Sequence, residues 1–210
     1  MLLGALEAGG TKMVCAIGDE RGNVLDKVKF PTNTPKETMP QIIDYFKNKD
    51  IEALGIGSFG PVDVNPKSQT YGYITNTPKL AWRNYNIVGS VKEILNIPIG
   101  FDTDVNGAVL GEVALGCGKD LDSVVYITIG TGVGVGVYIN GNLLHGMLHP
   151  EAGHIIVIQR EDDTFKGMCP YHESCLEGLA SGPAIEKRWG TKAIALSDNS
   201  RVWELEAYYI

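Results

Sequence analysis

The stretch Phe101-Asp102-Thr103-Asp104-Val105-Asn106 lies halfway along the chain of 210 residues and decides how the rest is interpreted. The apolar run at residues 97–101, bounded by proline and glycine, is typical of the end of a buried strand. Val105, Val109 and Val113 then recur at helical spacing. Carboxylates therefore lie where a strand ends and a helix begins, which is where open α/β sheets collect their ligands. Either aspartate of the stretch could instead cap the helix by accepting backbone N–H groups.

The composition is that of a globular, acidic protein. Hydrophobic residues make up 44% of the chain, enough for one large domain or two small lobes. The formal net charge of -7, without a basic cluster, argues against nucleic acid or an anionic membrane as a partner. No apolar run approaches the ~20 residues of a membrane-spanning helix, and the chain does not begin with a signal-peptide pattern. We therefore expect a cytoplasmic protein.

The first half of the chain alternates strand and helix patterns. Apolar runs at residues 1–8 and 13–17, joined by Gly9-Gly10, predict a hairpin, and residues 24–30 predict a third strand. Thr34-Pro35-Lys36-Glu37 predicts a helix start, because it combines a capping box with proline at the first helical position. The remaining elements predicted in this half are a strand at 53–57, a helix at 91–95, a strand at 97–101 and the helix that begins near Asp104.

After Gly116-Cys117-Gly118 the pattern restarts. Apolar runs at residues 123–129 and 133–139 flank a Gly-Thr-Gly turn, which repeats the opening of the chain at a coarse level. We therefore expect an N-terminal lobe at residues 1–115 and a second lobe at residues 116–210.

Two glycine turns, Gly9-Gly10-Thr11-Lys12 and Gly130-Thr131-Gly132, each carry a threonine between paired strands. Backbone N–H groups freed by such turns, with a hydroxyl beside them, can hold phosphate oxygens. Neither turn matches G-x-G-x-x-G or G-x-x-x-x-G-K-[ST], and each by itself could be an ordinary hairpin. Because the two occur in matching positions and flank an acid at a strand end, the sequence favours phosphate binding.

A metal site is indicated by His154, Cys169, His172 and Cys175. The last three form a C-x2-H-x2-C pattern in a loop bounded by glycine and proline, and a reducing compartment favours a metal over a disulfide there. Two thiolates and two imidazoles make a closed tetrahedral zinc site, so we expect a structural Zn2+. The alternative is two free cysteines and solvated histidines.

Two glutamates flank this loop and are candidates for ligand contact. Glu151 precedes His154, and Glu177 follows directly after the metal loop. Either could instead be an ordinary surface carboxylate. We expect His145 and His149 to be loop histidines without a role in the site.

Taken together, these motifs resemble the ROK family of sugar kinases, and most of all its zinc-containing fructokinases. Five ordered motifs carry the resemblance, which covers the whole chain. They are the Gly-Gly-Thr-Lys hairpin, the Gly60-Pro61 loop, the Asp-x-Asn helix start, the Gly-Thr-Gly hairpin, and Glu-x-Gly-His with the Cys/His loop and Leu176-Glu177-Gly178. The resemblance implies an α/β fold of the actin-like ATPase (ribonuclease H-like) type, two lobes of βββαβα repeats, here with the second lobe incomplete.

The resemblance also implies a role for each motif. Asp104 would be the general base that takes the proton of a sugar hydroxyl as it attacks the γ-phosphate of ATP. The implied partners are a hexose and ATP with Mg2+, and the implied assembly is a homodimer. The residues implied to bind phosphate are Gly9, Gly10, Thr11, Lys12, Gly130, Thr131, Gly132 and Pro183; those implied to bind sugar are Gly60, Pro61, Thr103, Asp104, Glu151 and Glu177; those implied to bind zinc are His154, Cys169, His172 and Cys175.

The chain departs from the family pattern in four ways. Thr103 stands where the family usually has asparagine, His172 replaces a cysteine of the zinc loop, and Glu7 replaces an aspartate. Family kinases are also longer, and nothing here supplies their glycine-rich adenine loop. We therefore expect these 210 residues to be a fragment of a longer protein, inactive by itself.

The resemblance favours phosphorylation of D-fructose to fructose 6-phosphate, with glucose, mannose and N-acetylmannosamine left open as substrates. One alternative is a sugar-sensing regulator of the same family, which the acidic charge and the first strand at residue 2 disfavour. The other is a non-catalytic, zinc-stabilised sugar-binding module.

Overall fold

The computed structural model describes residues 1–147 and 149–210. Its contacts divide the chain into two compact units, which are treated separately below. The first unit comprises Met1–Val124 and Gly136–His149, and the second comprises Val125–Val135 and Pro150–Ile210. These units are defined differently from the lobes expected from the sequence, whose boundary between residues 115 and 116 stays a prediction.

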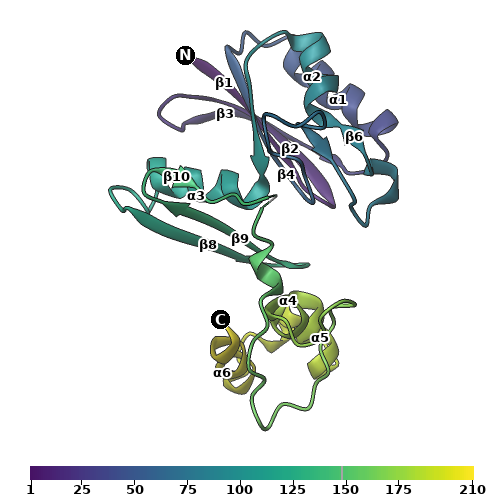
Figure 1. Cartoon of the computed structure of the whole chain (residues 1–210), viewed down its shortest axis with the longest axis vertical. Coiled ribbons are helices and arrows are strands. Elements are labelled where there is room, and N and C mark those ends of the chain that lie inside the picture. Colours follow the sequence, from purple (N-terminus) through teal and green to yellow (C-terminus); the bar gives the residue numbers. More distant parts are fainter. Residues whose placement is uncertain (148) are drawn as a thin grey trace. The chain divides into compact units, whose positions relative to one another are not determined.

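A five-stranded mixed sheet forms the centre of the first unit (Figure 1). The strand order is β3-β2-β1-β4-β7; β1, β2 and β3 are antiparallel, and β4 runs parallel to both β1 and β7. This confirms the predicted meander and the strands after it. The strands are β1 (Leu2–Ala8), β2 (Lys12–Asp19), β3 (Val24–Pro31), β4 (Ala53–Ser58) and β7 (Ile99–Thr103).

Three helices accompany this sheet: α1 (Pro35–Lys47), α2 (Ile87–Leu95) and α3 (Asp104–Leu115). The predicted start of α1 is confirmed, since Glu37 Oε2 accepts hydrogen bonds from Thr34 N at 3.1 Å and Thr34 Oγ1 at 2.8 Å. Helix α2 begins four residues earlier than predicted. Its start is fixed by Asn86, whose Oδ1 accepts a hydrogen bond from Gly89 N at 2.7 Å and so caps the first turn.

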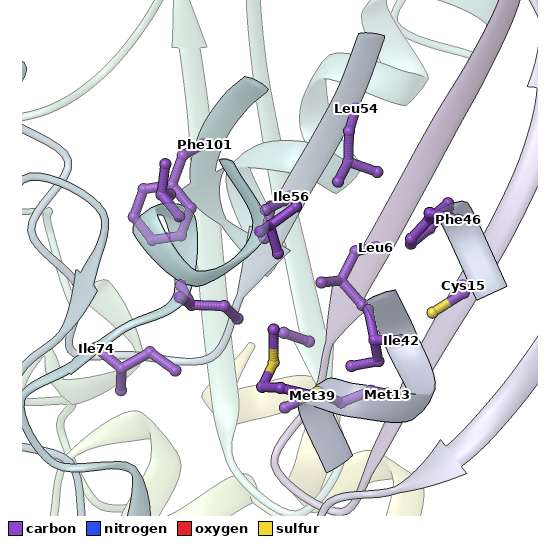
Figure 2. Packing of buried hydrophobic residues seen from close by; sticks show 14 of the residues in the cluster. Leu6, Met13, Cys15, Met39, Ile42, Phe46, Leu54, Ile56, Ile74 and Phe101 are labelled. Atoms are coloured by element: carbon purple, nitrogen blue, oxygen red, sulfur yellow. The ribbon is translucent and has the colours of Figure 1, made fainter. Parts of the chain in front are cut away.

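One hydrophobic core holds α1 and α2 against the sheet (Figure 2). Met39, Ile42 and Phe46, the i, i+3, i+7 face of α1, are buried in the same cluster as Leu6 and Ile56 of the sheet. Cys15 is buried here too, and burial raises the pKa of its thiol to about 12. A thiol in that environment is a small core residue rather than a nucleophile.

The segment between β4 and α2 contains only short elements, β5 (Tyr73–Ile74), the 3-10 turn η1 (Leu80–Trp82) and β6 (Tyr85–Asn86). Trp82 anchors it: the ring is 1% exposed, and its Nε1 donates a hydrogen bond to Asn33 O at 2.6 Å. The segment is therefore held by the buried Trp82 ring rather than by long regular elements.

A second sheet has the order β10-β9-β8, and its residues fall in both units. Its strands are β8 (Ser123–Ile129), β9 (Val133–Ile139) and β10 (Asn142–Leu143). The two apolar runs and the intervening glycine turns were predicted at these positions, and the prediction is confirmed.

After residue 150 the second unit combines loops with short helices. Two small hydrophobic clusters support it, one around Leu176 and Leu179 and the other around Ile185 and Val202. Its elements are η2 (Ala152–His154), α4 (Leu176–Ala180), α5 (Gly182–Trp189), η3 (Ala193–Leu196) and α6 (Ser200–Tyr209).

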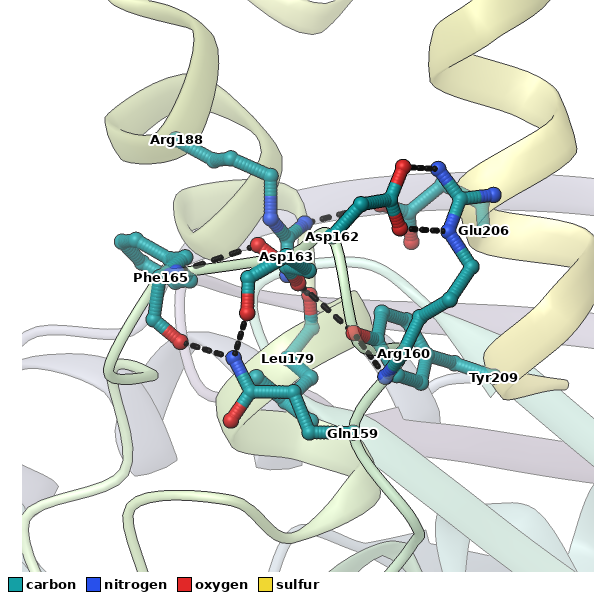
Figure 3. A network of polar contacts seen from close by, with 9 residues as sticks. All are labelled: Gln159, Arg160, Asp162, Asp163, Phe165, Leu179, Arg188, Glu206 and Tyr209. Carbon is teal, nitrogen blue, oxygen red and sulfur yellow. Dashed lines mark hydrogen bonds and ion pairs between the residues drawn. The ribbon is translucent and has the colours of Figure 1, made fainter.

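A buried polar network joins α5, α6 and the loop before the metal-site cysteines (Figure 3). The guanidinium of Arg188 lies 3.2 Å from Asp163 Oδ2 and 3.1 Å from Glu206 Oε1. Tyr209 OH donates a hydrogen bond to Asp163 Oδ2 at 2.6 Å. Burial raises the pKa of Glu206 to about 7, although the charge of Arg188 opposes this. Two carboxylates thus share one buried guanidinium.

Candidate functional site

Each predicted ligand loop of the first unit begins just after one of three residues that pair in a row across neighbouring strands. Ala8 of β1 pairs with Ser58 of β4, and Ser58 pairs with Thr103 of β7. The three strands are parallel neighbours, so each predicted loop begins at the same edge of the sheet, within roughly 5 Å of the next strand. The row therefore brings together the turn after Ala8, the Gly60-Pro61 loop and Asp104.

Thr103, rather than either aspartate, caps α3. Thr103 Oγ1 accepts a hydrogen bond from Asn106 N at 3.1 Å, and the side chain is 4% exposed. The interpretation of Asp102 or Asp104 as the cap is therefore wrong, because the hydroxyl of the intervening residue occupies that position. Asp104 is the first residue of α3; it is exposed, and its Oδ1 accepts a hydrogen bond from Val105 N at 2.9 Å.

Asp102 has a different environment. Its Oδ1 accepts hydrogen bonds from Thr103 N and from Asn106 Nδ2, both at 2.7 Å. Its Oδ2 lies 2.7 Å from His145 Nε2. No sequence pattern links Asp102 to a histidine 43 positions away, and we expected His145 to have no role in the site.

His149 also has a defined contact. Its Nε2 accepts a hydrogen bond from Val62 N at 3.3 Å, directly after the Gly60-Pro61 loop, whose peptide bond is cis. Two histidines of one short segment thus contact the end of β7 and the loop after β4. Their spacing, His-x3-His before a proline, was the signal available in the sequence.

The first glycine turn is held by the end of β3. Thr32 Oγ1 donates a hydrogen bond to Gly9 O at 2.7 Å, and Thr32 N donates one to Thr11 O at 3.0 Å. Lys12, the first residue of β2, is exposed. The turn is anchored through the carbonyl groups of Gly9 and Thr11.

The second glycine turn lies against the start of α5. Gly182 N donates a hydrogen bond to Gly130 O at 2.8 Å, so the turn contacts the residue before Pro183. Glu177 Oε2 accepts a hydrogen bond from Val133 N at 3.0 Å. A Cβ at position 132 would lie 2.5 Å from that carboxylate oxygen, which explains the glycine there. The structure thus brings together the phosphate-site residues predicted in the second unit.

His154, Cys169, His172 and Cys175 converge as predicted, with their ligand atoms within 4.8 Å of one another. The Nδ1 atom of His154 lies 3.7 Å from Cys169 Sγ and 3.6 Å from Cys175 Sγ, and His172 Nδ1 lies 3.7 Å from Cys169 Sγ. Metal–sulfur and metal–nitrogen bonds of about 2.3 and 2.05 Å at the tetrahedral angle separate the two ligand atoms by about 3.6 Å. The four residues therefore fit one tetrahedral metal ion.

The two candidate sugar glutamates also belong to the second unit. Glu151 is exposed and has a left-handed backbone conformation with φ of 49° before η2. The Oε1 atom of Glu177 lies 3.9 Å from Nε2 of His154, the ring nitrogen that faces away from the cysteines. Glu177 therefore links the metal cluster to the second glycine turn.

Comparisons with known proteins give the same family throughout. The chain is 57% identical over 209 residues to a protein of Bacillus subtilis (strain 168) and 49% identical over 210 residues to the fructokinase of Pediococcus pentosaceus. Each alignment covers 100% of this chain, and they cover 70% and 73% of the two relatives.

Solved structures support the fold. A ROK family glucokinase from Streptomyces griseus, in complex with glucose and AMPPNP, is 30% identical with a TM-score of 0.69, over 89% of this chain and 59% of that one. The ROK hexokinase from Thermus thermophilus is 27% identical with a TM-score of 0.74, over 100% of this chain and 74% of that one. The architecture is the predicted actin-like ATPase type.

Across the described part of the chain, every helix is too short or too polar to span a bilayer.

The model of the ROK family matches residues 3–205. With that match, the sheet-edge row and the two glycine turns in place, the chain belongs to the ROK family.

Proposed function

We propose that this protein transfers the γ-phosphoryl group of ATP to a hexose, with D-fructose as substrate and fructose 6-phosphate as product. Fructokinases that are 43–49% identical over 99–100% of the chain support the choice of fructose. The observation that carries the proposal is the row Ala8–Ser58–Thr103, because it places an exposed carboxylate, Asp104, at the sheet edge that also bears a glycine turn.

Asp104 is the proposed general base. It lies in the first turn of α3, where the helix dipole stabilises a negative charge. As a sugar oxygen forms its bond to the γ-phosphorus, the hydroxyl proton passes to the Asp104 carboxylate, and the bond to the bridging oxygen breaks to release ADP. A base in this position contributes roughly 10²–10⁴-fold to the rate.

The phosphates are proposed to bind at backbone N–H groups. In the first unit these belong to the turn Gly9–Lys12, and in the second to Gly130–Gly132 and the N-terminus of α5 beside it. An α-helix N-terminus favours anions because its first N–H groups have no partner within the helix. Mg2+ bound with ATP would neutralise part of the phosphate charge.

The metal cluster is proposed to hold a structural Zn2+. Two cysteines and two histidines fill all four tetrahedral positions, so no open position is left for chemistry. Glu151 and Glu177 are proposed to bind sugar hydroxyls. Because Glu177 Oε2 already accepts from Val133 N, its sugar contact would use Oε1.

The test is ADP release by the full-length protein, measured in a coupled assay with fructose, glucose, mannose and N-acetylmannosamine. Asp104→Asn should lower kcat by about 10²–10⁴-fold, because the amide cannot take the proton. The control is Asp44→Asn, an exposed aspartate on α1 that should leave the rate unchanged.

Three results would contradict the proposal. Full activity in Asp104→Asn would remove Asp104 as the base. Sugar binding without ADP release from any hexose would favour a binding module or a regulator. A rate with glucose well above that with fructose would replace the substrate but keep the reaction.

A further inference from the structure

We propose that His145 is a positioning residue, which acts through Asp102 to fix the turn that carries Asp104. This inference rests on the proposed function, because it assigns a role in presenting the proposed base. It concerns atoms of the first unit only.

Asp102 is the centre of a hydrogen-bond cluster that spans the turn. Its Oδ1 accepts from the backbone N–H of Thr103, just before Asp104, and from the side chain of Asn106, two residues after it. The Asn106 side chain is buried, 1% exposed. The orientation of one carboxylate therefore determines the backbone on both sides of Asp104.

His145 is the donor to the other oxygen of this carboxylate, with 2.7 Å between Nε2 and Asp102 Oδ2. The Asp102 side chain is 16% exposed, and that of His145 is 37% exposed. Since Asp102 is only partly hydrated, the imidazole N–H replaces water as the partner of Oδ2. A carboxylate held at both oxygens is less free to rotate than one held only at Oδ1.

The rest of the turn is already fixed by packing. A Cβ at Gly136 of β9 would lie 2.2 Å from Val105 O, so the strand backbone lies directly against the first turn of α3. Thr103 supplies the helix cap. The contact with His145 therefore restricts the side-chain torsions of Asp102.

The segment that bears His145 has its own second anchor. His149 Nε2 accepts from Val62 N at 3.3 Å, beside the Gly60-Pro61 loop. The segment is thus attached to the end of β7 and to the loop after β4, which gives it an anchor outside α3. This distinguishes a positioning contact from an incidental surface pair.

The ring tautomer provides a test that is independent of catalysis. Because carboxylate Oδ2 accepts, Nε2 of His145 must carry a proton. Two-dimensional 15N–1H NMR of the histidine side chains should show a protonated Nε2 that becomes unprotonated or exchanges rapidly in Asp102→Asn. A neutral ring with its proton on Nδ1 would overturn the inference.

The kinetic test uses three variants of the full-length protein. His145→Ala should lower kcat for fructose about 10- to 100-fold and leave KM for ATP within about twofold, because a base misplaced by a fraction of an ångström slows the chemical step. His145→Gln should recover kcat to within about threefold, since its amide N–H can donate to Asp102 Oδ2. Asn142→Ala, which removes one exposed side-chain hydrogen bond from the same region, should have no effect.

The outcomes separate this inference from the proposed function. A wild-type protein that releases no ADP with any hexose overturns the proposed function. An active wild type whose His145→Ala variant keeps its kcat overturns the inference alone. Equal losses in His145→Ala and His145→Gln also overturn it, because they would reflect lost packing rather than a lost donor.

Discussion

The Asp104 turn and the metal loop are both irregular backbone at a proposed site, yet they are stabilised in different ways. The turn follows a buried strand in a unit whose core contains eighteen buried residues. The metal loop belongs to a unit whose two buried clusters contain six and three. Between His154 and Cys169, Ile156 and Ile158 are 67% and 84% exposed. Burial orders the first region, whereas we propose that metal coordination orders the second.

Irregular backbone at a proposed site is thus supported differently in the two units. In the first, β-sheet register sets where each loop begins, so the chain is ordered before any ligand binds. In the second, fewer buried apolar side chains are available to order the loop, and we expect the proposed metal ion to supply the missing stabilisation.

The largest effect is expected from removing the metal. Structural zinc contributes on the order of 10 kcal/mol of folding free energy in small zinc peptides. Cys175→Ser or a strong chelator should abolish amide hydrogen-exchange protection in residues 154–180 and leave the amides of β1 and β4 protected. The measurement is residue-resolved exchange by mass spectrometry or NMR.

Cys117→Ser is the control, because Cys117 is an exposed cysteine outside the cluster. It should change neither region. Unchanged protection of residues 154–180 after chelation would show that the loop is ordered without metal.

A smaller effect is expected from cavities in the two cores. Leu54 and Leu179 are 1% and 0% exposed and belong to the larger and a smaller cluster respectively. Each Leu→Ala change should lower the free energy of unfolding by about 2–5 kcal/mol. The loss for Leu54→Ala should lie nearer the upper end of this range, because the larger cluster around Leu54 can collapse less into the cavity.

Urea denaturation with exchange readouts for each unit measures both costs. A greater loss for Leu179→Ala than for Leu54→Ala would mean that the small cluster is the more rigidly packed one. It would also contradict the view that burial matters less in the second unit.

The smallest effect concerns pH. Because the folded-state pKa of Glu206, about 7, is raised above its unfolded value, its stabilising contribution is complete below about pH 4.3 and is lost as pH rises through 7. Glu206→Gln should remove this dependence and make the fall in unfolding free energy between pH 5 and 8 smaller by up to about 3 kcal/mol.

Glu204→Gln is the matched control, since Glu204 is exposed on the same helix, α6. Thermal melts from pH 5 to 8 measure both variants. The same pH slope in Glu206→Gln and in the wild type would show that Glu206 does not bind an extra proton in the folded state.

Much of the first unit was predictable because its signals are local. Hydrophobic alternation predicted the meander, and the Thr34–Glu37 capping pattern predicted the start of α1. The Gly9-Gly10 turn and the start of α3 were predicted from equally local signals. Helix α2 was predicted too short, because the cap at Asn86 lies within an aromatic, irregular segment whose period is not helical.

The candidate site was predicted in part for the same reason. Cysteines and histidines at ligand spacing identify a metal cluster, and the structure brings all four together. The contacts of Asp102, His145 and His149 were missed, since a hydrogen bond across 43 residues leaves no periodic signal in the sequence.

The sequence by itself determined the longer strands, the starts of α1 and α3, the glycine turns and the four candidate metal ligands, because propensity, capping and ligand chemistry act over a few neighbouring residues. Only the tertiary structure decided that Thr103 caps α3, that Asp102 is held by His145, and that Glu177 joins the metal cluster to the second glycine turn. These contacts depend on strand register and close packing, which bring distant residues within hydrogen-bond distance.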